Sequence, residues 1–157
     1  MREILFRGKR KDNSEWLWGD FLQDRDLGVC LIEGFDYYTD ADGLQRDYFQ
    51  YEVIPETIGQ YTGVTDKNGN KIFEGDIISI MFETDCVDGF PGYSWYETAD
   101  VVWSKEKSAW IIIFNDGGEE MYLNEYNDAD DIYVVGNIYD EPKHLIGDEI
   151  CEIDLKA

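Results

Sequence analysis

Residues 53–80 constrain the fold of this chain most strongly, because this segment places turn residues between short runs of apolar and β-branched residues. Asn68-Gly69 lies between two such runs and is typical of a two-residue type I′ hairpin turn, whose central residues both need a positive φ. Gly75-Asp76 marks a second turn, directly before the apolar run at residues 77–82. The segment therefore predicts antiparallel strands joined by tight turns, and it contains no catalytic motif.

The rest of the chain repeats this pattern. Its apolar segments are short, and Gly, Asn or Asp turns separate them. The 157 residues include 11 Tyr, 8 Phe and 5 Trp but only 3 Pro, which favours strands over a helical bundle. We predict a mostly β fold with an N-terminal β-meander unit at residues 1–65 and a small SH3-like barrel at residues 66–140. A tail at residues 141–157 follows, and the two units can pack as one domain.

Individual strands can be predicted from the apolar alternation. In the first half, Trp16 and Trp18 share one strand face, Gly19 is a candidate bulge, and residues 33–47 form a variable surface loop with a turn at Asp42-Gly43. The second half predicts five short strands with a long first loop at residues 83–99, and closing such strands into a barrel would remove the open sheet edges. The tail predicts either a helical turn near residues 143–146 or a strand that pairs with another subunit.

The chain is strongly acidic, with 13 basic and 35 acidic residues and a formal net charge of −22. This charge disfavours binding of nucleic acid by the bulk surface. Residues 1–11 are the exception, with five basic side chains against one Glu. This segment either folds back onto the acidic surface, alternates out to solvent or forms a nucleic-acid arm. The acidic surface itself either keeps the protein soluble or imitates the phosphate backbone of DNA.

Three cysteines, Cys30, Cys86 and Cys151, lie far apart with no CxxC pair, so neither a disulfide framework nor a zinc site is indicated. Free thiols fit a reducing cytoplasm. The longest apolar run near the N-terminus is residues 4–6, much too short for a signal sequence or a membrane span. We expect a cytoplasmic protein without a cofactor.

Candidate catalytic and metal sites are weak. Residues 66–77 begin like a calcium-binding loop, but Lys71 stands where Gly is required and Ile77 stands where Glu is required. Residues 127–131 hold a cluster of Asn and Asp that could bind a hard cation, although neighbouring acids in a loop usually stay hydrated. His144 has no nucleophile motif beside it, and residues 89–93 lack the Lys and the helix of a phosphate loop. We nominate no catalytic, cofactor or metal residue.

The best candidate site is an aromatic group within the loop at residues 83–99. Aromatic anchors inside an acidic rim suit a protein partner with a basic surface, because rings supply buried area and charges speed encounter. The aromatic members are Phe90, Tyr93, Trp95 and Tyr96, and the flanking acids are Asp85, Asp88, Glu97 and Asp100.

Four blocks of sequence resemble the YopX family: M-R-E-I-L-F-R-G-K-R at residues 1–10, W-L-W-G-D-F at residues 16–21, P-E-T-I-G-Q-Y-T-G-V-T-D-K-N-G-N-K-I-F-E-G-D at residues 55–76 and V-V-G-N-I-Y-D at residues 134–140. The blocks occur in this order over nearly the whole chain. The resemblance implies a bacteriophage or prophage origin, a β-rich fold with an SH3-like C-terminal unit, and homo-oligomerisation. It implies no activity, so it assigns no catalytic residue.

These observations favour a non-enzymatic protein-binding or assembly module whose partners are other copies of itself or a basic host or phage protein. Two alternatives remain open: a DNA mimic that inhibits a host DNA-binding protein, and a hydrolase whose carboxylates meet only in the folded state. A hydrolase predicts two converging carboxylates in a concave pocket, whereas a binding module predicts an exposed acidic and aromatic face.

Overall fold

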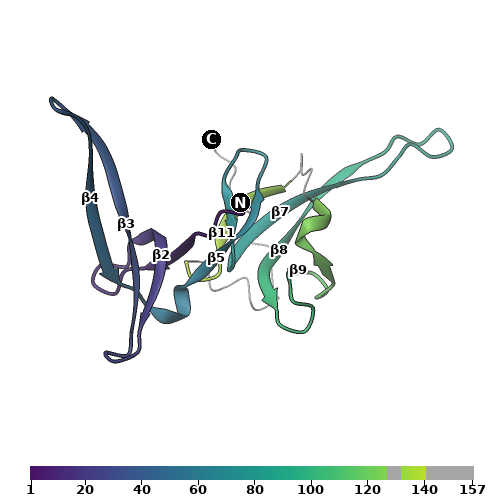
Figure 1. The fold of residues 1–157 in the computed structure, drawn as a ribbon. Coiled ribbons are helices and arrows are strands. Elements are labelled where there is room, and N and C mark those ends of the chain that lie inside the picture. Colours follow the sequence, from purple (N-terminus) through teal and green to yellow (C-terminus); the bar gives the residue numbers. More distant parts are fainter. Residues whose placement is uncertain (127–131, 141–157) are drawn as a thin grey trace.

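The computed structural model describes residues 1–126 and 132–140, and nearly all regular structure in this part of the chain is antiparallel β (Figure 1). The prediction of a mostly β fold is confirmed. Helical structure within these residues is confined to two short 3₁₀ turns, η1 (Pro55–Thr57) and η2 (Leu123–Tyr126), and neither is long enough to cross a membrane. The helical turn predicted near residues 143–146 lies outside the described residues.

Six strands form the first sheet, in the order β4-β3-β2-β1-β5-β6. Strands β1 to β4 form a meander, because each pairs with the next one along the chain. Gly19 was predicted as a bulge, but it pairs in regular register with Phe6. A Cβ at this position would lie 2.2 Å from the Glu33 carbonyl oxygen, so glycine permits the close approach of β2 and β3. The strands are β1 (Phe6–Lys9), β2 (Trp16–Asp24), β3 (Val29–Asp40), β4 (Gly43–Glu52), β5 (Gly59–Thr65) and β6 (Lys71–Phe73).

Five strands form the second sheet, in the order β10-β9-β8-β7-β11. This sheet is open, so the prediction of a closed SH3-like barrel is not confirmed. Closure would require its two edge strands to pair with each other, but within residues 1–126 and 132–140 each pairs on one side only, and β10 has just three residues. The strands are β7 (Asp76–Glu83), β8 (Ser94–Ser104), β9 (Ala109–Phe114), β10 (Glu120–Tyr122) and β11 (Ile132–Asn137).

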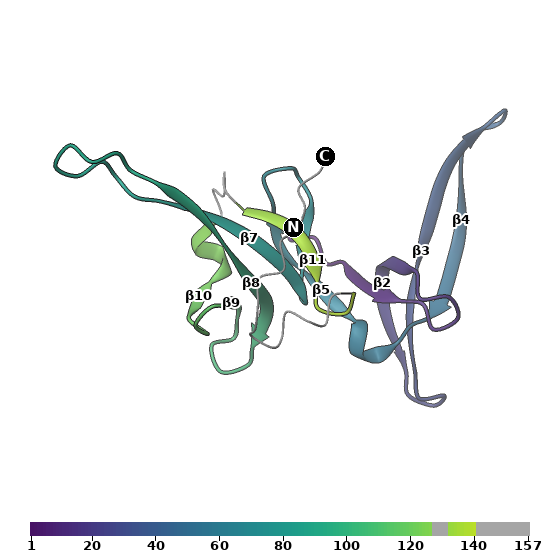
Figure 2. The same ribbon diagram turned by 180° about the vertical axis from the view of Figure 1, so that it is seen from behind.

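Two long hairpins project from the body of the molecule (Figures 1 and 2). The first is β3–β4, which occupies the segment predicted as a loop at residues 33–47. That prediction was wrong because the many Asp residues there alternate with aromatic residues, as a two-faced strand requires. The second is β7–β8, whose pairing continues to Glu83 and Ser94, so the predicted loop at residues 83–99 is shorter than expected.

The main core lies over the second sheet. Its members are buried apolar residues that alternate along β7, β8 and β9, joined by one residue each from β6, η2 and β11. They are Ile72, Ile78, Ile80, Ala99, Val101, Ile112, Phe114, Leu123 and Ile132. The strands of the first sheet bury fewer side chains completely, namely Ile32 and Ile72, and Val53, just after β4, is also fully buried. Because the core is concentrated at one end, both hairpins extend beyond it.

A polar joint connects the two sheets. The guanidinium of Arg7 in β1 lies 2.6 Å from the carboxylate of Asp76 in β7, and the Arg7 and Asp76 side chains are only 9% and 1% exposed. The guanidinium also lies against Trp16 and Phe73, with its central carbon 4.8 and 5.0 Å from the two ring centroids. The charge of Arg7 is therefore matched by Asp76 within a nearly dry site.

A second part of the joint lies just after β11. The carboxylate of Asp140 pairs with Lys9 and accepts hydrogen bonds from the indole of Trp16 at 2.9 Å and from the amide of Asn137 at 2.7 Å. Burial by itself would raise the pKa of Asp140, but these bonds outweigh it and lower the pKa to about 2. The Tyr139 ring also packs on Trp16, with centroids 6.0 Å apart.

These contacts explain the basic N-terminal segment. Four of its five cations, Arg7, Lys9, Arg10 and Lys11, form ion pairs with acidic residues of this chain. The segment thus folds back onto acidic residues of the chain, which is one of the alternatives that the sequence left open. Arg2, the fifth cation, lies beside a surface hollow described below.

Candidate functional site

The aromatic residues selected from the sequence lie on the β7–β8 hairpin. Phe90 and Tyr93, in its end loop, are 76% and 67% exposed. Trp95 is already in β8 and stacks on Phe82 of β7, with centroids 5.6 Å apart and ring planes inclined by 22°. Tyr93 contacts Trp95, and Phe82 contacts the buried ring of Phe114. A row of rings therefore runs from the core toward the tip of the hairpin.

Local backbone chemistry shapes the tip. Asp88 and Gly89 both have positive φ values, 51° and 84°, and the Phe90 N–H donates to the Val87 carbonyl at 3.0 Å. These features make a two-residue type I′ turn, the form that Asp-Gly favours. Its twist matches that of the flanking strands, so the ribbon can extend into solvent without splaying.

The structure does not bring all the selected residues together. Tyr96 is opposite Met81 in the register and therefore points to the face away from Trp95 and Phe82. Asp100 is buried at the base of β8 and cannot belong to an exposed acidic rim. Glu97 does lie on the same face of β8 as Trp95, because its carboxylate accepts a hydrogen bond from the Trp95 indole at 2.6 Å. Asp85 and Asp88 are exposed near the tip.

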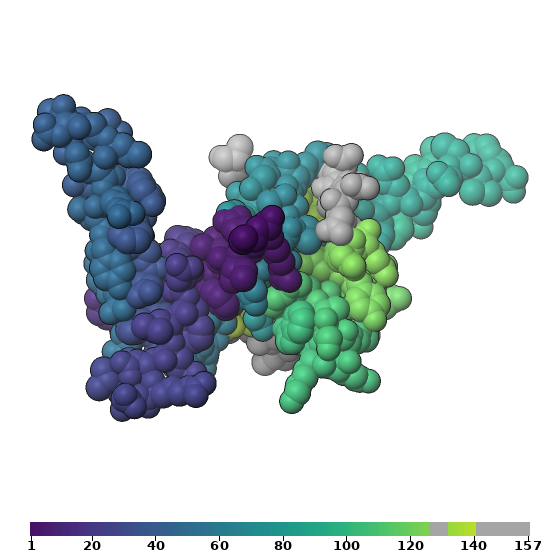
Figure 3. Space-filling view, in the orientation of Figure 1, coloured from purple at the N-terminus to yellow at the C-terminus, as the bar shows by residue number. Residues whose placement is uncertain are grey.

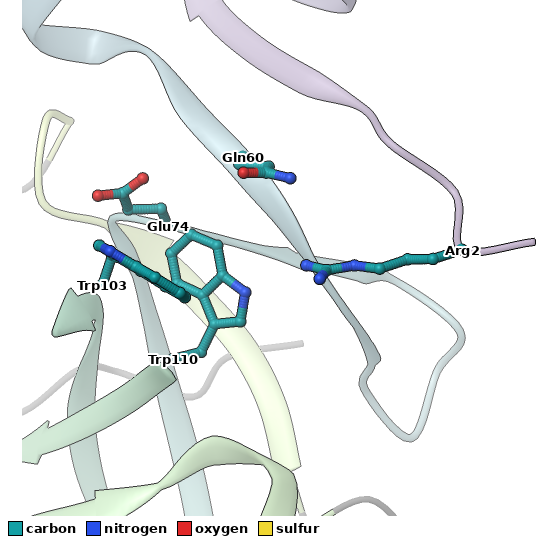
Figure 4. A pocket seen from close by; sticks show the side chains of 5 residues that line it. All are labelled: Arg2, Gln60, Glu74, Trp103 and Trp110. Carbon is teal, nitrogen blue, oxygen red and sulfur yellow. The ribbon is translucent and has the colours of Figure 1, made fainter. Parts of the chain in front are cut away.

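A shallow hollow lies between the two sheets (Figure 4). Its volume is about 240 Å³, and it is lined by Arg2, Gln60, Glu74, Trp103 and Trp110. The two indoles meet edge to face, with centroids 4.8 Å apart. Burial raises the pKa of the Glu74 carboxyl, although a backbone hydrogen bond from Gln60 opposes the shift. The hollow is smaller than the usual 300 to 1,000 Å³ of ligand pockets, so its geometry gives no strong sign of a substrate site.

The two tryptophans of the hollow were missed in the sequence. Trp103 and Trp110 are directly opposite each other in the β8–β9 pairing, on either side of the turn predicted at residues 105–108. Counting back from that turn would have paired them, since residues at equal distances from a hairpin turn face each other. The remaining three residues come from distant segments, so no local sequence signal could have linked them.

The turn at Asn68-Gly69 differs in type from the prediction. Gly69 has a φ of 82° and Asn68 does not have a positive φ, so the turn is not type I′. Instead, the Gly69 N–H donates to the Asp66 carbonyl at 2.9 Å, and the Asp66 N–H donates to the Asn70 carbonyl. This is the pattern of a type I turn followed by a glycine bulge. Gly75, before Asp76, also has a positive φ, of 83°.

The carboxylate of Asp66 explains the resemblance of this segment to a calcium loop. It accepts hydrogen bonds from the backbone N–H groups of Asn68 and Asn70, from the Asn70 side chain and from the backbone N–H of Val134 in β11. Burial would raise the pKa of Asp66, but these donors outweigh it and hold the pKa below its ordinary value. The acid therefore organises the turn and attaches it to β11.

Residues 1–126 and 132–140 contain no group of three or more His, Cys, Asp or Glu side chains arranged to hold a metal ion. Cys30 and Cys86 are free thiols, and the Cys86 sulfur accepts a hydrogen bond from the Gly92 N–H at 3.3 Å. The Asn and Asp cluster at residues 127–131, His144 and Cys151 lie outside the described residues.

Comparison with known proteins gives a family and a fold. The family model described as YopX protein matches residues 5–146. A solved structure with a similar fold is the crystal structure of protein EF1440 from Enterococcus faecalis, with a TM-score of 0.53 and 19% sequence identity. The similarity covers 93% of this chain and all of that one. No curated protein matches the sequence.

Proposed function

We propose that this chain, which belongs to the YopX family, is a non-enzymatic binding module that uses the tip of its β7–β8 hairpin to hold a protein with a basic surface. The observation that carries the proposal is the exposure of Phe90 and Tyr93 at the end of a ribbon that projects from the body (Figure 2). Exposed aromatic residues on a projecting element suit insertion into a partner surface.

The ring contacts support this role. Trp95 is fixed between Tyr93 and Phe82, and Phe82 is fixed against the core residue Phe114. A preorganised aromatic element loses little conformational entropy on binding, which favours affinity. The proposed interface therefore has an anchor, formed by Phe90, Tyr93 and Trp95, and a rigid support behind it.

Charge supports the choice of partner. The chain carries −22 formal charges, while four of the five N-terminal cations are already engaged in intramolecular ion pairs. A basic surface would be drawn to this protein at long range, and a nucleic acid would be repelled. The family resemblance and the free thiols suggest a phage or prophage protein that acts in the cytoplasm of a bacterial host.

The test begins with capture of partners from a bacterial lysate on the immobilised chain, followed by kinetic measurement with the purified partner. Tyr93→Ser should raise the dissociation rate at least tenfold, because it removes an anchor ring, and should leave the association rate within about twofold. Raising the salt concentration from 0.05 to 0.5 M should slow association, as screening of the long-range attraction requires.

Tyr96→Ser is the matched control. Tyr96 is 61% exposed, close to the 67% of Tyr93, but it lies on the other face of β8, so its removal should leave both rates unchanged. Equal effects of the two substitutions would contradict the proposed site. Binding of duplex DNA by the unaltered chain at physiological salt would contradict the proposed partner.

A further inference from the structure

The end of the β3–β4 hairpin is the least supported element of the described chain. All ten residue pairs from Leu31–Glu52 to Asp40–Gly43 are formed, but β2 pairs only with residues 29–33 of β3. From Gly34 onward, no third strand in the described part of the chain accompanies the ribbon, which stands clear of the body in Figure 3. A two-stranded ribbon with no third strand is only marginally stable in water, so a covering surface would stabilise this one.

The two faces of the ribbon differ in chemistry. One face, called here the aromatic face, carries Phe35, Tyr37, Leu44 and Tyr48. These four side chains are between 44% and 72% exposed. On the other face, called here the acidic face, Phe49 covers Gly34 at the base of the ribbon. Beyond it this face carries three aspartates with no cation among them, together with one tyrosine and one glutamine: Asp36, Asp40, Asp47, Tyr38 and Gln45.

The aromatic face is ordered and electrically balanced. Phe35 and Tyr48 pack with centroids 5.6 Å apart, and the guanidinium of Arg46 lies 4.6 Å from the Phe35 centroid. The Tyr48 hydroxyl donates to the carboxylate of Glu33 at 2.7 Å. Between residues 33 and 50 this face therefore holds one positive and one negative side chain, whereas the chain as a whole is strongly negative.

The aromatic side chains of this face do not pack against the core of their own chain. Ile32 is fully buried at the base of β3 and lies an even number of residues from Asp36, so it points to the same side of the sheet as the acidic face. The aromatic face is therefore on the opposite side, turned away from the buried Ile32. A basic partner would be attracted to the acidic face instead. Two copies of a chain with −22 charges repel each other, and this repulsion is smallest where the contact is apolar and nearly neutral.

We propose that the aromatic face of the β3–β4 ribbon is the surface through which two copies of this chain associate, ribbon stacked on ribbon. A two-fold axis through the contact would bring Arg46 of each copy toward Glu33 of the other. The face is roughly 20 Å long, since six steps separate Gly34 from Asp40 at about 3.4 Å each. This contact is smaller than the standard area of about 800 Å² per partner, so the association should be reversible on dilution.

Sedimentation velocity of the full chain between about 1 and 500 µM tests the proposal. The unaltered protein should pass from a monomer of 18.3 kDa to a dimer, and the association should strengthen with added salt, because screening reduces repulsion between like-charged copies. This salt response is opposite in sign to that of the basic partner on the β7–β8 hairpin. Failure of one proposal is therefore distinguishable from failure of the other.

Adjacent tyrosines provide a matched pair of variants. Tyr37→Ser, on the aromatic face, should weaken dimerisation at least tenfold, and Tyr38→Ser, on the acidic face, should leave it within about twofold of the unaltered chain. Far-UV circular dichroism at low concentration checks that both variants are folded. A monomer at every concentration, or equal effects of the two substitutions, would overturn the proposal, as would binding of a different protein to the aromatic face of a monomeric chain.

Discussion

At the scale of single residues, several acidic side chains of this protein act as structural acceptors. The Asp66 carboxylate accepts hydrogen bonds from four N–H groups. The Asp140 carboxylate forms an ion pair with a lysine and accepts hydrogen bonds from an indole and an amide. A carboxylate suits such a position because its two oxygens accept several hydrogen bonds at once. A part of the acidic composition is therefore used within the fold, although most of the 35 acids contribute to the surface field.

Asp66→Asn should destabilise the protein at neutral pH by about 1 to 3 kcal/mol, because an amide has a single acceptor oxygen and two of the four donors lose their partner. The folded-state pKa of Asp66 is lowered, so its stabilisation is complete above the unfolded value of about 3.9 and is lost as the pH falls through the folded value. Urea unfolding should therefore show a difference from the unaltered chain that shrinks from pH 6 toward pH 2.

Asp116→Asn is the control for this measurement. Asp116 lies exposed in the turn after β9, and its replacement should change the unfolding free energy by less than about 0.5 kcal/mol at every pH. A constant penalty for Asp66→Asn down to pH 2 would show that its charge is not what the donors stabilise.

At the scale of strands and turns, the sequence predicted well wherever apolar alternation was uninterrupted. The pattern in residues 77–82 and 109–114 identified β7 and β9 closely. It identified the base of β3 and of β4 but failed for their outer parts, residues 33–40 and 43–47, because Asp mixed with Tyr resembles a polar loop when only hydrophobicity is considered. The apolar pattern also failed to show which candidate-site residues share a face. The face that Tyr93 or Tyr96 occupies depends on strand register, and pairing with β7 sets that register.

Gly69→Val should destabilise the protein by roughly 1 to 2 kcal/mol, because the site has a φ of 82° and a β-branched residue resists the left-handed region. A Cβ at Gly69 would meet no atom within 4 Å, so a steric clash does not contribute. Gly117→Val is the matched control, since Gly117 is equally open but has no positive φ. Thermal unfolding of both variants gives the comparison, and equal melting temperatures would exclude backbone strain as the cause.

At the scale of the whole molecule, the joint between the sheets determines whether they unfold together. Arg7 and Asp76 lie on different sheets, and Lys9 and Trp16 of the first sheet hold Asp140 after the last strand of the second. Most of the large buried core belongs to the second sheet. The first sheet therefore depends on this joint for a good part of its attachment, and we expect one cooperative transition when tryptophan fluorescence and circular dichroism are followed together.

Arg7→Met should lower the unfolding free energy by about 3 kcal/mol or more, because it leaves the carboxylate of Asp76 in a nearly dry site without its cation. The double variant Arg7→Met/Asp76→Asn removes both charges while the asparagine oxygen still accepts from the Phe73 N–H, so its cost should be less than the sum of the two single substitutions. The exposed pair of Lys107 and Glu120 is the control, with an expected coupling below about 1 kcal/mol.

Additive effects at Arg7 and Asp76 in urea unfolding would mean that the ion pair does not hold the sheets together. If the two probes also separated in Arg7→Met but coincided in the unaltered chain, the joint would be the element that makes both sheets one cooperative unit.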